Sequence, residues 1–246
     1  MSEFLTIRHS RDDHSYIDGK NNTSLTCEGI EIAKNMSNEV LNCVDDRKII
    51  VRHSTKKRAI ETAEILCERF DKNNIDYEVK SDSNLTELYQ GEFRNLDLLN
   101  HEERIQLLQS CWEEFDEHRL NNNLDYRFGD YKNAINKKID SRFTVDPFGE
   151  SQRDFSIRIG KAILSICRDM QDGFLPINIT HRGAIREIKN LLRSVNENVP
   201  MEQIEDYEIF GMKYCEIVKC NFDNLKLAEQ SLIRYIKERS KYEDHN

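Results

Sequence analysis

Arginine and histidine follow three stretches of apolar, strand-forming sequence. The first stretch, residues 4–7, runs directly into Arg8 and His9. The other two are residues 48–53, followed by Ser54 and Arg58, and residues 175–180, followed by His181 and Arg182. A guanidinium group donates paired hydrogen bonds to a phosphate and keeps its charge at any working pH, and an imidazole can act as a nucleophile. The sequence therefore predicts a phosphoryl-transfer site that needs no metal.

These side chains can meet only if the chain brings the three strand ends together. Amphipathic helix patterns begin at Thr26, after Ser54 (the predicted N-cap), at Glu150 and after Gly183. A further strand is expected near residues 75–80, one or two closing strands in 207–222, and a last helix over 225–239. Strands that alternate with helices favour a parallel sheet covered on both faces. We therefore expect an α/β fold, a three-layer α/β/α sandwich with a mainly parallel central sheet, whose strands carry the site at their carboxyl ends.

Residues 97–148 differ in character from the alternating pattern. They combine helical stretches, an asparagine run and many aromatic residues. We interpret this segment as a helical cap inserted into one domain that spans residues 1–246, because the sequence shows neither an internal repeat nor a low-complexity linker.

Composition narrows the class of protein. The net charge of -9 argues against non-specific binding to nucleic acid or to an anionic membrane. No apolar stretch approaches the ~18 residues of a membrane span, and the N-terminus does not have the pattern of a signal peptide. The seven cysteines are scattered without a C-x-x-C pair, which favours free thiols in a reducing cytoplasm over zinc ligands or disulfides.

Six segments, in order across residues 4–186, resemble the motifs of the histidine phosphatase superfamily, also called phosphoglycerate mutase-like, in the branch that uses a glutamate as acid. The family shows Arg-His-Gly, Leu-Thr-x-x-Gly, Ser-x-x-x-Arg-Ala-x-x-Thr-Ala, Leu-x-Glu, Gly-Glu-Ser and a closing histidine motif. The matching segments are Arg8-His9-Ser10, Leu25-Thr26-Cys27-Glu28-Gly29, Ser54 through Arg58-Ala59 to Thr62-Ala63, Leu85-Thr86-Glu87 followed by Gly91, Gly149-Glu150-Ser151 with Arg158, and His181 with Gly183 and Ile185-Arg186.

The resemblance implies a phosphatase that acts on a small phosphorylated metabolite without a cofactor or metal. It implies that His9 is the nucleophile and forms a phosphohistidine, while Arg8, Arg58 and His181 hold the phosphate oxygens. Glu87 would protonate the leaving oxygen and then activate water. Without the motifs, we would interpret Arg58 as an exposed helix residue and Glu87 as one of many loop glutamates. Neither the substrate nor the oligomeric state can be read from the sequence.

Two departures from the family pattern bear on the site. Ser10 and Arg182 stand where the family has glycines, so Ser10 is expected to place a side chain close to the bound phosphate. Arg182 is expected to narrow the pocket or to supply a further cation for a second anionic group. Two alternatives stay open: a phosphoglycerate-type mutase, and a non-catalytic module that binds phosphorylated ligands. Ser15 occupies the position six residues past the nucleophile where the mutases have asparagine, which weakens the mutase reading.

Overall fold

The computed structural model describes residues 2–13, 23–88, 150, 152–201, 204 and 212–240. The chain divides into two compact units, Met1–Glu87 with Ile157–Asn246, and Leu88–Ser156. The first unit holds all the predicted site residues and is the one considered below. The predicted cap at 97–148 lies outside the described residues and stays a prediction.

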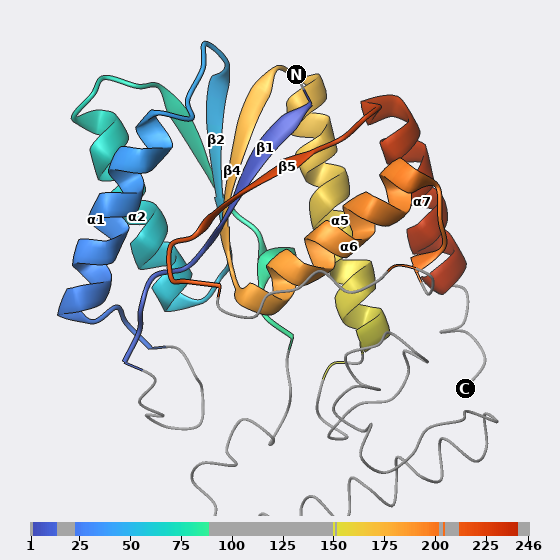
Figure 1. Cartoon of the computed structure of the whole chain (residues 1–246), viewed down its shortest axis with the longest axis horizontal. Helices are drawn as coiled ribbons and strands as arrows, with labels where there is room; N and C mark the ends of the chain where they lie inside the picture. Colours follow the sequence, from blue (N-terminus) through green and yellow to red (C-terminus); the bar gives the residue numbers. More distant parts are fainter. Residues whose placement is uncertain are drawn as a thin grey trace, which may run out of the picture. The chain divides into compact units, whose positions relative to one another are not determined.

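The first unit is built on one five-stranded sheet (Figure 1). The strands lie in the order β3-β2-β4-β1-β5. β4 pairs in parallel with β1 and β2, β3 pairs in parallel with β2, and β5 pairs antiparallel with β1. The mainly parallel sheet predicted from the sequence is therefore confirmed. The strand bounds are β1 Glu3–Arg8, β2 Lys48–His53, β3 Tyr77–Ser81, β4 Phe174–Thr180 and β5 Ile217–Asn221.

Helices cover both faces of this sheet. Figure 1 shows α1 and α2 on one face and α5, α6 and α7 on the other, which confirms the three-layer α/β/α arrangement. The helix bounds are α1 Cys27–Leu41, α2 Lys57–Asp71, α5 Gln152–Gln171, α6 Arg182–Glu197 and α7 Leu225–Ser240, with a 3₁₀ turn, η1, at Ser83–Leu85. No helix of the described residues is long and apolar enough to cross a membrane.

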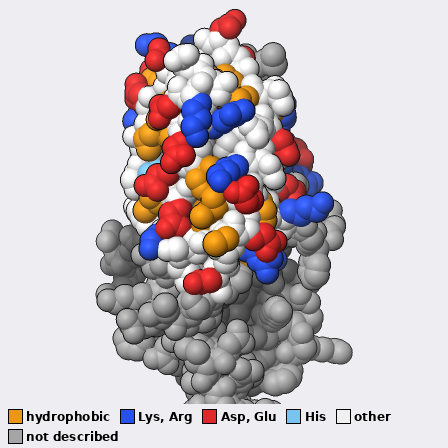
Figure 2. Space-filling view, turned by 90° about the vertical axis from the view of Figure 1, so that its left-hand side faces the viewer, with side chains coloured by type: hydrophobic (Ala, Val, Ile, Leu, Met, Phe, Trp, Pro, Cys, Tyr) orange, Lys and Arg blue, Asp and Glu red, His pale blue; other side chains and the backbone are white. Residues whose placement is uncertain are grey.

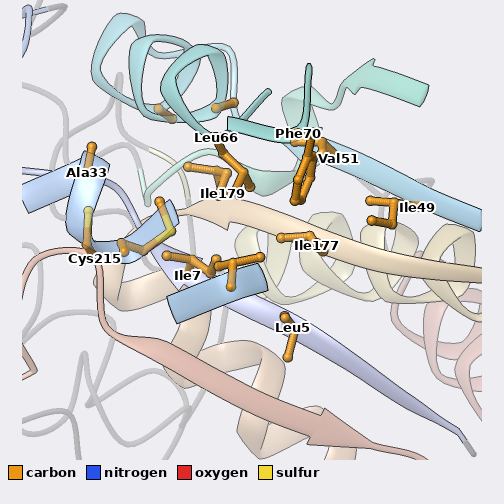
Figure 3. Packing of buried hydrophobic residues seen from close by; sticks show 14 of the residues in the cluster. Leu5, Ile7, Ala33, Ile49, Val51, Leu66, Phe70, Ile177, Ile179 and Cys215 are labelled. Atoms are coloured by element: carbon orange, nitrogen blue, oxygen red, sulfur yellow. The ribbon is translucent and has the colours of Figure 1, made fainter. Parts of the chain in front are cut away.

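One face of the sheet packs on α1 and α2 through a continuous apolar core (Figure 3). Successive residues of a strand point to opposite faces, so Leu5 and Ile7 of β1 both reach this core and are fully buried. Ala59 and Ala63 lie on the inner face of α2, where small side chains let the helix approach the strands. The Ser-x-x-x-Arg-Ala-x-x-Thr-Ala motif thus supplies packing residues as well as Arg58.

The opposite face of β2 carries a buried charged group beside the apolar Ile50. The Arg52 side chain is 5% exposed. Its Nε donates to an Asp169 oxygen at 2.6 Å, and its Nη1 donates to an Asp82 oxygen at 3.1 Å. Lys80 Nζ lies 3.6 Å from the other Asp169 oxygen, so two cations face the two carboxylates and each buried charge is compensated. This is the condition under which such groups are tolerated.

The outer sides of α1 and α2 face solvent. Figure 2 shows acidic and basic side chains interspersed over this side of the molecule. Lys34 and Glu31 form one such pair at 2.6 Å, one turn apart on α1. Mixed charges at helical spacing keep this surface in water while the inner faces of both helices pack on the sheet.

The start of α1 explains the Leu-Thr-x-x-Gly motif. Thr26 is the N-cap, and its hydroxyl accepts the Gly29 N–H at 2.9 Å. A Cβ added to Gly29 would lie 2.0 Å from the carbonyl oxygen of Arg11, so only glycine allows the loop after β1 to cross the helix here. The motif therefore fixes the loop that directly follows His9.

The six described cysteines are free thiols, and four of them lie in apolar surroundings. Burial raises the pKa of each of these four thiols to about 11, because the thiolate is disfavoured away from water. They are Cys67, Cys167, Cys215 and Cys220.

Candidate active site

The carboxyl ends of three strands bring the two predicted catalytic histidines together. β4 lies between β1 and β2, and its end accepts two backbone hydrogen bonds: His9 N–H donates to the Thr180 carbonyl at 2.8 Å, and Ser54 N–H donates to the Ile179 carbonyl at 3.0 Å. The ring centroids of His9 and His181 are consequently only 5.0 Å apart. Both side chains are buried, with 6% and 1% of their residue surface exposed.

Hydrogen bonds define the tautomer of the His9 ring. Its Nδ1 lies 2.7 Å from the carbonyl oxygen of Ser10. A carbonyl oxygen can only accept, so Nδ1 carries the proton and Nε2 keeps its lone pair. The Arg58 Nε–H donates to that lone pair at 3.1 Å. His9 is therefore held with the nitrogen a nucleophile needs directed at the guanidinium that would bind phosphate.

His181 is fixed from both sides of its ring. Its Nε2 lies 2.7 Å from the Ser54 hydroxyl, and its Nδ1 lies 3.4 Å from Arg58 Nη2. Arginine has only donors, so Nδ1 is the accepting nitrogen in this contact. The predicted role of Ser54 as N-cap is wrong: Lys56 is the N-cap of α2, without a side-chain bond. Ser54 instead orients His181.

The Arg8 side chain contacts Met212 and Tyr214. Its Nη1 donates to the Met212 carbonyl at 2.6 Å, and its guanidinium carbon lies 4.0 Å from the centre of the Tyr214 ring. Burial lowers the pKa of Arg8 below its usual value, and the charge of Arg182 lowers it further by a smaller amount. Arg182 itself is exposed at the first position of α6.

Glu87 faces the N-terminus of α6. Its Oε2 accepts the Gly183 N–H at 3.0 Å. A Cβ added to Gly183 would lie 2.3 Å from Glu87 Oε1, so the closing histidine motif needs glycine here for the carboxylate to approach. The charge of Glu87 also acts on Arg8, which places the carboxylate within electrostatic reach of that guanidinium.

Ser10 does not direct its hydroxyl at the imidazoles. The side chain is completely buried and donates to the Gly29 carbonyl at 2.6 Å, while its backbone N–H donates to the Thr62 hydroxyl at 3.0 Å. The side chain thus ties the loop after β1 to α1. The predicted role of Ser10 in substrate binding stays a prediction.

Two residues next to the site were not foreseen from the sequence. Asp12 is 2% exposed, and its Oδ2 lies 3.7 Å from Arg58 Nη1 and accepts the Thr23 hydroxyl. Tyr214 places its ring under Arg8, with its centroid 6.0 Å from that of His9. Asp12 lies in a run of charged loop residues, and nothing in the sequence distinguishes the one that turns inward.

The assembled groups suit a phosphate ion. Two imidazoles and the Arg58 guanidinium are in mutual contact, and the first turns of α2 and α6 begin beside them. The free N–H groups and positive dipole ends of helix N-termini add to the attraction for an anion. Within the described residues, no group of three or more His, Cys, Asp or Glu is arranged to hold a metal ion.

Several solved structures share this fold over most of the chain. A mycobacterial glucosyl-3-phosphoglycerate phosphatase in complex with VO3 matches with a TM-score of 0.55 and 18% identity, covering 89% of this chain and 90% of that one. YhfR from Bacillus stearothermophilus matches with a TM-score of 0.58 and 18% identity, covering 91% and 93%. A putative alpha-ribazole-5'-P phosphatase from Escherichia coli matches with 0.53 and 17%, covering 89% and 95%. The fold is thus one that phosphatases use.

The family model described as "Histidine phosphatase superfamily (branch 1)" matches residues 4–126, half of the chain. The chain belongs to the histidine phosphatase superfamily. A search of curated protein sequences finds no match.

Proposed function

We propose that this protein hydrolyses small phosphomonoesters through a phosphohistidine formed on His9. The observation that carries the proposal is the hydrogen bond from His9 Nδ1–H to the Ser10 carbonyl, at 2.7 Å. It holds the ring with the Nε2 lone pair on the side where Arg58 and His181 converge. A neutral, oriented imidazole beside a guanidinium is the arrangement that attack on a phosphate requires.

The first chemical step joins His9 to phosphorus. His9 Nε2 attacks, a P–N bond forms and the ester P–O bond breaks. Glu87, protonated beforehand, gives its proton to the departing oxygen. Arg58, which donates to His9 Nε2 in this structure, would exchange that contact for the phosphate oxygens, together with Arg8 and His181. These donors stabilise the charge spread over the transferring group.

The second step restores the enzyme. The Glu87 carboxylate takes a proton from water, the water oxygen attacks phosphorus, and the P–N bond breaks. Inorganic phosphate leaves and His9 regains its lone pair. Arg182, exposed beside Arg8, is proposed to meet a second anionic group on the substrate.

The direct test uses the full chain with p-nitrophenyl phosphate and with an alkyl phosphomonoester, in the presence of a chelator. We expect phosphate release, and radiolabel from a ³²P substrate trapped on the protein as an acid-labile, base-stable adduct. His9→Ala should lose both signals. Turnover that survives in His9→Ala, or that appears only with an added divalent metal, would refute the mechanism.

The same assay separates the alternatives left open by the sequence. A mutase would move the phosphoryl group between positions of one substrate with little net phosphate release. A binding module would retain phosphate ligands without any release or adduct. Two of the neighbours in structure are named as phosphatases, which favours hydrolysis. The cytoplasmic location predicted from the cysteines stays a prediction.

A further inference from the structure

A single arginine holds the backbone of the segment that carries Glu87. Arg158 lies on α5 and directs its guanidinium at residues 83–87. Its Nη1 is within hydrogen-bonding distance of four oxygens, and its Nη2 lies 3.4 Å from the Glu87 carbonyl. The four oxygens are the Asn84 carbonyl at 2.8 Å, the Thr86 carbonyl at 2.9 Å, the Thr86 hydroxyl at 3.0 Å and the Ser83 carbonyl at 3.4 Å.

The segment needs such a donor because of how it is built. The 3₁₀ turn η1 ends at Leu85, and the residues from Thr86 to Leu88 form no regular element, so the hydrogen bonds of a helix or strand do not fix the course of their backbone. A guanidinium presents several N–H groups in one plane, so it can donate hydrogen bonds to several converging carbonyls at once. A lysine ammonium cannot match this geometry. The positive charge also suits the carbonyl end of the turn.

Two other contacts fix the same segment from the side of the sheet. The Thr180 hydroxyl donates to the Leu85 carbonyl at 2.5 Å, and the Glu87 carboxylate accepts the Gly183 N–H at 3.0 Å. Thr180 and Gly183 flank His181. The contact with Gly183 therefore fixes the Glu87 carboxylate relative to the imidazoles, while Arg158 fixes the backbone of the segment that carries Glu87.

We propose that Arg158 is a positioning residue that sets the reach of Glu87 toward the leaving oxygen. This inference rests on the proposed function, in which Glu87 is the acid. Arg158 touches neither phosphate nor His9 in this scheme, so it acts only on the steps that involve Glu87. A general acid matters most when the leaving group is a poor one, and its contribution is typically 100-fold or more.

The test compares Arg158→Met with wild type on two substrates. With the alkyl phosphomonoester, we expect kcat to fall about 100-fold, because displacement of a catalytic group by about 1 Å costs that much. With p-nitrophenyl phosphate, whose leaving group departs without a proton, we expect less than about a threefold loss in phosphoenzyme formation. KM should change less than kcat for both. Arg158→Lys should recover only part of the alkyl rate.

Two further variants make the test specific. Arg168→Met removes another arginine of α5, one that is exposed and pairs with Glu229, and it should leave both rates unchanged. Glu87→Gln should show the same substrate-dependent loss as Arg158→Met. The double variant Arg158→Met/Glu87→Gln should be no slower than Glu87→Gln alone, since residues that act as a unit are not additive.

The outcomes separate this inference from the proposed function. If wild type is active and His9-dependent but Arg158→Met slows phosphoenzyme formation from both substrates equally, or if its effect multiplies with that of Glu87→Gln, the positioning role is refuted and the proposed function stands. If wild type turns over neither substrate, the proposed function falls and takes this role with it. Should Arg158→Met fail to fold, as judged by circular dichroism, the same comparison on Arg158→Lys decides the question.

Discussion

Gly183→Ala should inactivate the proposed acid step while the fold survives. The added Cβ would lie 2.3 Å from Glu87 Oε1, against an ordinary contact of 3.4 Å or more, so the carboxylate must withdraw by about 1 Å. The side chain of Glu87 can make this shift cheaply, which is why stability is spared. A displacement of this size costs about 100-fold in rate, or about 2.7 kcal/mol of barrier.

In this variant we therefore expect activity to fall while the stability of the fold changes little. Gly183 lies in α6 without a left-handed backbone, so alanine gains about 0.5–1 kcal/mol from the unfolded state, offset by the weakened bond to Glu87 at 3.0 Å. We expect the free energy of unfolding in urea to change by less than about 1 kcal/mol. Phosphoenzyme formation from the alkyl phosphomonoester should be about 100 times slower, and its formation from p-nitrophenyl phosphate should be affected far less.

A matched glycine provides the control. Gly160 lies inside α5, and an added Cβ would meet Ile236 at an ordinary 3.4 Å. Gly160→Ala should stabilise the protein by about 0.5–1 kcal/mol and leave both rates unchanged. Wild-type activity of Gly183→Ala on the alkyl substrate would show that the carboxylate need not stay beside α6, and the reasoning would be refuted.

Three predictions concern stability. Arg52→Met should cost about 3–5 kcal/mol in urea unfolding, because Asp82 loses its cation and Asp169 keeps only Lys80. A loss under 1 kcal/mol would contradict the pairing. Gly29→Ala should lower stability by about 1–3 kcal/mol, since its Cβ would meet the Arg11 carbonyl, a backbone atom, at 2.0 Å; an unchanged melting temperature would disprove the close approach. The free energy of unfolding should also fall as pH rises from about 9 to 11. The thiols of Cys67, Cys167, Cys215 and Cys220 ionise near 9.0 when unfolded but only at about 11 when folded, so the unfolded state releases its protons first. Urea titrations across this range check the slope, and a flat profile would exclude it.

The sequence predicts the fold well because its patterns are local. Residues 48–53 and 175–180 are short apolar runs bounded by helix patterns, and such runs form buried parallel strands whatever their order. Convergence of Arg8, His9 and His181 follows from the same logic, since parallel strands end at one edge. The strand order itself does not follow, because it depends on pairings between segments more than 100 residues apart.

Side-chain direction in loops is what the sequence cannot give. Ser10 stands where a smaller residue is expected, yet its hydroxyl finds the Gly29 carbonyl on α1. Ser54 precedes a helix as a capping serine would, yet it bonds to His181. Asp12 turns inward while its neighbours Arg11 and Asp13 stay exposed. In each case the partner is a long-range contact that leaves no trace in local spacing.

Because β4 lies between β1 and β2, the candidate active site can assemble only late in translation. In the nascent chain, His9 and Arg58 are translated early. The strand β4, which lies between β1 and β2, ends at Thr180 and is translated much later. Until then β1 and β2 have no common neighbour, and the second imidazole is still missing. A cut anywhere in residues 88–156 leaves the two imidazoles on separate pieces, so we expect the proposed activity only when both halves reassemble.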